Sequence, residues 1–153
     1  MNSFLIRTAT PADAEPITTI YLRSREAFLP YAPSAYSDEA IAKWIATVVI
    51  ARGGATVVVR DGAVAAFCST SIDVDGVCWI DQLYASPDAV GLGLGASLLR
   101  TALSTLSRPI RLYTFEANTA ARRFYERHGF NAIAFGDGSG NEEKCPDVLY
   151  ELR

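Results

Sequence analysis

Hydrophobic residues occur in short runs along the chain, and their spacing changes from strand-like to helical near residue 90. Residues 77–85 are apolar with one carboxylate, Asp81, inside the run, which predicts a strand. Ser86, Pro87 and Asp88 end it, because proline has no N–H for a ladder hydrogen bond. Three glycines follow, and apolar residues then recur at helical spacing: Leu94, Leu98, Leu99, Ala102, Leu103 and Leu106. This stretch therefore predicts a strand, a connector, a glycine-rich loop and a helix.

The same spacing rules predict the remaining elements. Strands are expected at residues 4–7, 56–60, 63–72, 110–115, 130–135 and 147–152. Further helices are expected after the caps Thr10 or Asp13, Ser37 or Asp38, and Asn118. Asp61-Gly62 predicts a hairpin turn. Because a helix joins strand 77–85 to strand 110–115, these two should be parallel with a right-handed crossover. The pattern predicts a mixed α/β (α+β) fold.

Gly91, Gly93 and Gly95 alternate with leucines at the entrance to the predicted helix. Glycine leaves main-chain N–H groups uncovered, and with the helix dipole they form an anion site, most naturally for a pyrophosphate. Two other interpretations stay open. The glycines could form only a tight turn, or a Rossmann dinucleotide site with Glu116 as the ribose ligand. The spacing G-x-G-x-G followed by Ala96, and the connector at 86–90, disfavour the Rossmann site.

Residues 118–130, NTAARRFYERHGF, carry a second motif. With Leu83-Tyr84-Ala85-Ser86-Pro87 and the glycine loop, the chain resembles the GNAT superfamily of acetyl-CoA-dependent N-acetyltransferases. That family has a strand ending in Leu-Tyr-Val-x-Pro, a Q/R-x-x-G-x-G/A pyrophosphate loop, and later N-x-x-A-x-x-F-Y-x-x-x-G-F. The last motif is matched by Asn118, Ala121, Phe124, Tyr125, Gly129 and Phe130. The resemblance covers most of the chain, with Val90 standing where the family has Gln or Arg.

The resemblance implies a GNAT-like central mixed sheet, splayed between its fourth and fifth strands, flanked by about four helices, with acetyl-CoA held in the splay. It implies that the main-chain amides of Leu83 and Ala85 contact the acetyl carbonyl and the pantetheine arm. Asn118 should bond the pantetheine as well as cap its helix. Because Val90 lacks the family's polar side chain, main-chain amides hold the phosphates. The residues expected to bind the cofactor are Leu83, Tyr84, Ala85, Val90, Gly91, Leu92, Gly93, Leu94, Gly95, Ala96, Asn118, Ala121 and Tyr125.

Acyl transfer from a thioester to an amine needs a neutral amine, donors for the developing oxyanion, and a proton for the leaving thiolate. The resemblance implies that Tyr125 gives this proton to the CoA sulfur. The alternative for Tyr125 is a packed aromatic ring beside Phe124 on an amphipathic helix. No cysteine is placed for a covalent acyl intermediate, so the amine should attack directly in a ternary complex.

Asp81 is the candidate base. Alternate residues of its strand should share one face, namely Val77, Trp79, Asp81 and Leu83. A carboxylate in an otherwise apolar strand is desolvated, which raises its pKa toward use as a base. A structural carboxylate bonded to loop amides and a water relay are the alternatives.

Two segments are candidates for binding the acceptor amine. Glu142 and Glu143, with Asp137 and Asp147 nearby, place negative charge before the last strand, where they form either a solvated loop or a site for a cationic amine. The aromatic connector at 28–36, FLPYAPSAY, is the other candidate wall. Its aromatic faces would be supplied by Phe28, Tyr31 and Tyr36.

Composition narrows the class of protein. With 153 residues we expect one domain, residues 1–153. The net charge of −3 and the lack of a basic run disfavour a nucleic-acid partner. Three cysteines and one histidine show no metal-ligand spacing, so we expect no metal. No signal region or long apolar run is present, so we expect no membrane association and a soluble, cytoplasmic protein. Residues 141–150, NEEKCPDVLY, resemble a segment of a bacterial subset of the GNAT family, which implies a bacterial-type protein.

The sequence leaves three functional hypotheses. The first is an acetyl-CoA-dependent N-acetyltransferase acting on a primary amine of a small molecule or peptide. The second is a degenerate domain that binds acyl-CoA without turnover, which Val90 favours. The third is a nucleotide-binding domain that uses the glycine loop. The family resemblance also carries an expectation of a homodimer.

Overall fold

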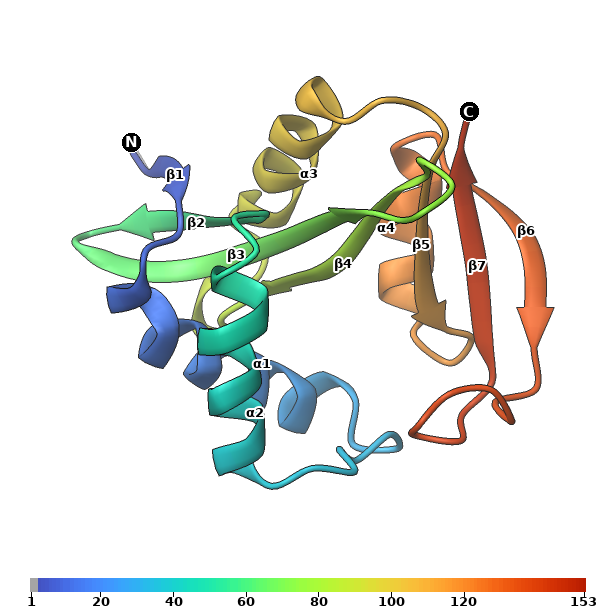
Figure 1. The fold of residues 1–153 in the computed structure, drawn as a ribbon, viewed down its shortest axis with the longest axis horizontal. Helices are drawn as coiled ribbons and strands as arrows, with labels where there is room; N and C mark the ends of the chain where they lie inside the picture. The colour runs from blue at the N-terminus through green and yellow to red at the C-terminus, as the bar shows by residue number, and fades with distance from the viewer. Residues whose placement is uncertain (1–2) are drawn as a thin grey trace.

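The computed structural model describes residues 3–153 (Figure 1). The strands are β1 (Leu5–Thr8), β2 (Ala55–Arg60), β3 (Ala63–Ile72), β4 (Cys78–Ala85), β5 (Ile110–Phe115), β6 (Asn131–Gly136) and β7 (Asp147–Leu152). The α-helices are α1 (Ala14–Phe28), α2 (Asp38–Trp44), α3 (Leu94–Thr105) and α4 (Thr119–Arg127). Short 3-10 turns precede α1 (η1, Pro11–Asp13) and α3 (η3, Pro87–Ala89), and α2 continues into a π-helical stretch, η2 (Ile45–Ile50). Every predicted strand and helix is present.

The seven strands form one mixed sheet in the order β1-β2-β3-β4-β5-β7-β6. The pair β4–β5 is parallel and is joined through α3, whereas all other neighbours are antiparallel. This confirms the parallel pairing expected from the intervening helix. The hairpin between β2 and β3 is also confirmed, since Asp61 and Gly62 both have positive φ, as a type I′ turn requires.

β4 and β5 separate after their first residues. Their pairing joins Cys78 to Ile110 and Trp79 to Arg111, and goes no further. β4 continues along β3, and β5 continues along β7, so the two halves of the sheet diverge. Figure 1 shows the gap widening from the paired ends toward the arrowheads of the two strands. The predicted splay between the fourth and fifth strands is confirmed.

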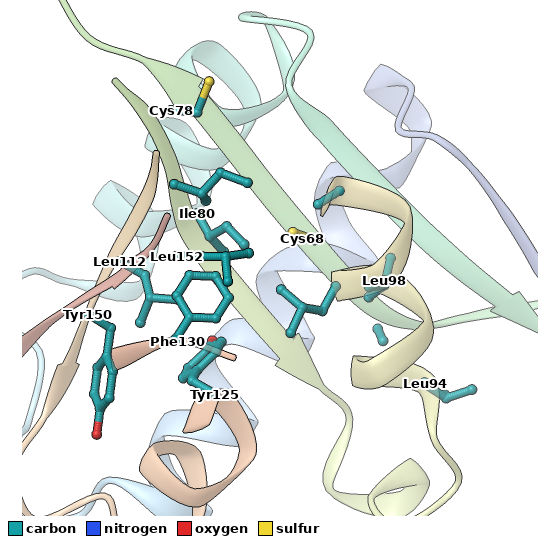
Figure 2. Packing of buried hydrophobic residues seen from close by; sticks show 14 of the residues in the cluster. Cys68, Cys78, Ile80, Leu94, Leu98, Leu112, Tyr125, Phe130, Tyr150 and Leu152 are labelled. Carbon is teal, nitrogen blue, oxygen red and sulfur yellow. The ribbon is translucent and has the colours of Figure 1, made fainter. Parts of the chain in front are cut away.

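Helices cover the two faces of the sheet with separate cores. On one face α3 and α4 bury Leu94, Leu98, Tyr125 and their neighbours against Ile110, Leu112 and Tyr150 (Figure 2). On the other face α1, α2 and η2 pack on Val57 and Phe67. Successive residues of a strand point to opposite faces, so Val57 packs in one core and Val58 in the other. The splay between β4 and β5 therefore lies between a layer of helices on one face of the sheet and a layer on the other.

Asp81 is the extra residue of a β-bulge in β4. Ile80 pairs with Thr70 and Gln82 pairs with Ser69, so no residue of β3 stands opposite Asp81. The bulge reverses the alternation along the strand. Ile80 before it and Leu83 after it both pack on the core under α3 and α4. The expectation that Val77, Trp79, Asp81 and Leu83 share one face was therefore wrong, because an inserted residue shifts the period-two pattern by one.

Candidate active site

A cavity of about 1080 Å³ occupies the splay. Its walls come from β4 and β5, from α1 and α2 on one side, and from α4 and the β6–β7 loop on the other. Of the predicted site residues, it is lined by Asp81, Leu83, Tyr84, Asn118, Ala121, Tyr125, Glu142 and Glu143. Segments that are distant in the sequence therefore line the same cavity, and local sequence patterns do not predict that proximity.

The edge of β4 supplies unpaired main-chain groups to the splay. The Ser86 N–H donates to Ala65 on β3, and the direction of main-chain groups alternates along a strand. The N–H groups of Leu83 and Ala85 thus point away from β3, toward the gap. The Ala85 carbonyl on that side accepts a 2.7 Å hydrogen bond from Ser24, which anchors α1 to the end of β4. The Leu83 amide remains available for a ligand in the splay.

Tyr125 lies on α4 with its ring in the core and its side chain on the cavity wall. The ring packs edge-on against Phe124 and Phe130, at centroid distances of 5.2 and 5.8 Å. Figure 2 shows it projecting from α4 toward the sheet. The side chain is buried, at 9% exposure. Burial raises the pKa of Tyr125, which keeps the phenol protonated and able to donate.

The glycine loop enters α3 with its amides uncovered. Gly91 and Gly93 have φ of +86° and +78°, a region that favours glycine, and the space beside each is open. Gly93 is the N-cap of α3 and has no side-chain cap. The first helical hydrogen bond runs from the Ser97 N–H to the Gly93 carbonyl. A helix start of this kind can bind a phosphate through several N–H groups at once.

The loop lies outside the cavity lining but is joined to it through α4. A Cβ on Gly95 would stand 3.8 Å from Phe124, the residue before Tyr125. Asn118, at the start of α4, accepts a 3.2 Å hydrogen bond from the Ala121 N–H, which confirms it as the helix cap. Its side-chain amide can still donate toward the cavity that it lines. The start of α3 and the helix that carries Asn118 and Tyr125 are therefore in contact near Gly95.

Asp81 lines the cavity at the bulge and remains solvent-exposed. Partial burial of the carboxylate raises its pKa, while a Ser71 hydrogen bond and the charge of Arg52 act in the opposite direction. The direction of the shift agrees with that expected from the sequence.

Two loops meet beneath the open end of the splay, as Figure 1 shows for the segments after α1 and before β7. Tyr36 donates a 2.7 Å hydrogen bond to Glu142. The Cys145 thiol lies 3.4 Å from the Tyr31 carbonyl. Glu142 is thus exposed but hydrogen-bonded across the two loops. Tyr36 and Leu29 line the cavity, whereas the predicted Phe28 and Tyr31 are not among its lining residues.

Arg25 is the main residue that the sequence reading missed. It lines the cavity with its side chain 10% exposed and contacts Tyr84, Ala32 and Glu143. An arginine in the last turn of a helix is ordinarily solvated. The available signal was its position four residues after Tyr21, on the apolar face of α1.

Within residues 3–153 no group of three or more His, Cys, Asp or Glu could hold a metal ion. None of the helices in this range is both long and apolar enough to cross a membrane.

Residues 19–130 match the model of the acetyltransferase (GNAT) family. The chain belongs to this family. The match extends from α1 through the glycine loop to α4 and so includes both motifs discussed above. Among curated proteins, no sequence matches this chain.

Solved GNAT structures share the fold over nearly the whole chain. An acetyltransferase from Bacillus cereus ATCC 10987 has a TM-score of 0.79 at 18% identity, covering 99% of this chain and 97% of its own. The PaiA N-acetyltransferase from Thermoplasma acidophilum, in complex with coenzyme A, has a TM-score of 0.76 at 21% identity, covering 99% of each chain. The ribosomal-protein-S18-alanine N-acetyltransferase from Escherichia coli has 0.69 at 19%, covering 98% and 93%. These identities establish the fold and leave the acceptor open.

Proposed function

We propose that this GNAT protein is an N-acetyltransferase that moves the acetyl group of acetyl-CoA to a primary amine of a small molecule or peptide. The observation that carries the proposal is the splay itself. The outward amides of β4, the cap of α4 and the Tyr125 side chain surround one cavity beside an uncovered glycine loop. This combination fits a long, phosphorylated thioester substrate better than a simple nucleotide.

The residues present fit acetyl-CoA. The amides of residues 90–96 would hold the pyrophosphate, Asn118 and Ala121 would flank the pantetheine, and Leu83 and Ala85 would bind the acyl end through main-chain amides. Val90 offers an aliphatic side chain, 55% exposed, where a polar one would add a contact. The phosphate site therefore depends on main-chain amides and the dipole of α3.

The reaction needs one bond made and one broken. The amine nitrogen attacks the thioester carbon, the C–N bond forms and the C–S bond breaks. Asp81, directly or through water, takes the proton that turns the entering ammonium into the neutral amine. The second proton, lost from nitrogen as the amide forms, returns through water to Tyr125. The Leu83 amide donates to the developing oxyanion. Tyr125 gives its proton to the departing sulfur, since its phenol is protonated near neutral pH.

The acceptor end of the cavity is acidic and aromatic. The charged residues that line it are Arg25, Asp81, Asp137, Glu142, Glu143 and Asp147, so carboxylates outnumber cations. Tyr36, Trp44 and Tyr84 add aromatic surface. This lining favours a protonated amine on entry. Glu142 and Glu143 would bind the ammonium group. Phe28 and Tyr31 do not line the cavity, so they would affect acceptor binding only indirectly.

A second candidate function is a degenerate domain that binds acyl-CoA without turnover, favoured by Val90. Isothermal titration with acetyl-CoA, CoA, NAD and ATP separates the classes of ligand. Binding of acetyl-CoA and CoA alone is expected, whereas preference for NAD or ATP would refute the proposal. A thiol-release assay with a panel of amines then separates enzyme from binding domain. Acetyl-CoA binding without thiol release from any amine would favour the degenerate domain.

A further inference from the structure

Arg25 is a buried cation with poorly satisfied donors. Its side chain is nine-tenths buried, at 10% exposure, and lies on the cavity wall. One donor makes a good hydrogen bond, from Nη2 to the Ala32 carbonyl at 3.0 Å. Nε is fully buried and has no hydrogen-bond partner among residues 3–153. Because Nε is closed to solvent, a ligand in the cavity can reach the guanidinium only through Nη1 and Nη2.

The other contacts of Arg25 are long. Nη1 lies 3.4 Å from the Tyr84 hydroxyl, and Nη2 lies 3.4 Å from Glu143 Oε1. A charge-assisted hydrogen bond between a guanidinium and a carboxylate has a length of about 2.7–2.9 Å and is commonly bidentate. Glu143 approaches with one oxygen and from outside that range. The guanidinium thus faces the cavity side of the loop without a fully formed ion pair.

The charges around Arg25 define which ligand it suits. Within the described residues, it is the one cation among the cavity-lining side chains, and five carboxylates surround the same space. An ammonium group entering the cavity has several carboxylates to bind. An acid group on the same molecule has one cationic partner, Arg25. A ligand that carries both charges would match this arrangement better than a simple cation.

We propose that Arg25 binds a carboxylate of the acceptor, so that the substrate is a compact amine bearing an acid group, of the amino-acid class. The inference rests on the proposed function. The acceptor carboxylate takes the place of Glu143 at the guanidinium, and Glu143 is released to the ammonium group. The aromatic rings of Tyr21 and Tyr84, which flank Arg25, contact the remainder of the acceptor.

The test uses acceptor pairs that differ only in the carboxylate: phenylalanine with phenethylamine, and lysine with cadaverine. Each is titrated calorimetrically into the CoA-bound protein. We expect the wild-type protein to bind at least one acid more tightly than its decarboxylated partner by about tenfold or more. Arg25→Gln should reduce that preference to near one while leaving amine binding within about threefold. Arg25→Lys, which keeps the charge without the fork, should restore part of it.

Glu143→Gln is the matched control for loss of the loop contact. It removes the charge opposite Arg25 but leaves the guanidinium, so the preference for the acid should persist. The proposal is overturned by a preference near one for both wild-type pairs. It is also overturned if Arg25→Gln weakens the binding of the acid and of its decarboxylated partner by the same factor. Loss of the preference for the acid in Glu143→Gln would overturn it as well. Calorimetry needs no turnover, so acid discrimination without thiol release would refute the proposed function and support this inference.

Discussion

The Tyr36 hydroxyl donates a 2.7 Å hydrogen bond to Glu142, joining two loops that lie 106 residues apart in the sequence. Both residues are exposed, and the bond to the carboxylate raises the pKa of Tyr36. Exposed hydrogen bonds contribute little to folding, so Tyr36→Phe should change the free energy of unfolding by under ~0.5 kcal/mol. The acceptor KM should rise several-fold because the loops separate, while the Kd for CoA should not change. Steady-state kinetics and calorimetry measure these two quantities. An unchanged acceptor KM would show that Tyr36 has no role in acceptor binding.

Tyr125→Phe should retain CoA binding and lose turnover. The substitution leaves the ring packed on Phe124 and Phe130, so the free energy of unfolding should change by under ~1 kcal/mol. Loss of a general acid lowers kcat by about 10²–10³-fold. The thiol-release rate and the calorimetric Kd for CoA are the two measurements. Wild-type kcat in this variant would remove Tyr125 from the mechanism.

Asp81→Asn should remove the acidic limb of the pH–rate profile. A base acts only when deprotonated, so wild-type activity falls as pH drops through the raised pKa of Asp81. A carboxylate whose pKa is raised by folding binds its proton more tightly in the folded state. Ionised Asp81 therefore destabilises the fold at neutral pH, and the Asn variant should be no less stable there. An unmoved pH–rate profile would favour the water relay.

Gly93→Ala should weaken CoA binding. Gly93 has φ +78° at the start of α3, and alanine in this region costs about 1–2 kcal/mol. The loop escapes that strain by leaving its phosphate-binding conformation, so the Kd for CoA should rise about tenfold. Gly76→Ala is the matched control, because Gly76 has φ +81° and equally open surroundings in a turn away from the cofactor. Equal effects of the two variants on CoA binding would contradict a role for the loop.

Asp13→Asn should destabilise the entry to α1 in a pH-dependent way. Arg7 donates to Asp13 at 2.7 and 3.0 Å, and this pairing, with the Thr10 N–H, lowers the pKa of Asp13 to about 2. A depressed carboxylate pKa stabilises the fold above its unfolded value near 4, and that contribution is lost as pH falls toward 2. The variant should lose about 1–2 kcal/mol at pH 7 after allowance for the partly exposed Arg7. Urea unfolding at pH 7 and pH 2.5 checks this, with a smaller difference expected at pH 2.5.

The glycine loop and the elements beside it are features that local sequence patterns predicted correctly. Alternating glycines before a leucine-rich helix predicted an anion-binding helix start, and Gly91 and Gly93 have the positive φ that such a loop uses. Proline at 87 and the helical spacing after it set the ends of β4 and α3 closely. These features depend on steric preferences within a few residues, so they can be read from the chain.

The acceptor side of the cleft could not be read in this way. Arg25, Tyr84 and Glu143 meet through packing between α1, β4 and the β6–β7 loop, and no local pattern encodes those distances. The bulge at Asp81 likewise depends on how β4 registers against β3, which shifts every later side chain to the opposite face.

The sequence by itself determined the order of strands and helices and the parallel β4–β5 pair, because periodicity and glycine or proline stereochemistry act locally. Acetyl transfer was indicated by the resemblance of its motifs to the GNAT family. Tertiary structure alone decided that the loop after α1 meets the loop before β7, and that a buried arginine shares one cavity with five carboxylates. Those outcomes depend on which apolar faces are buried against each other and on charges brought together from distant segments.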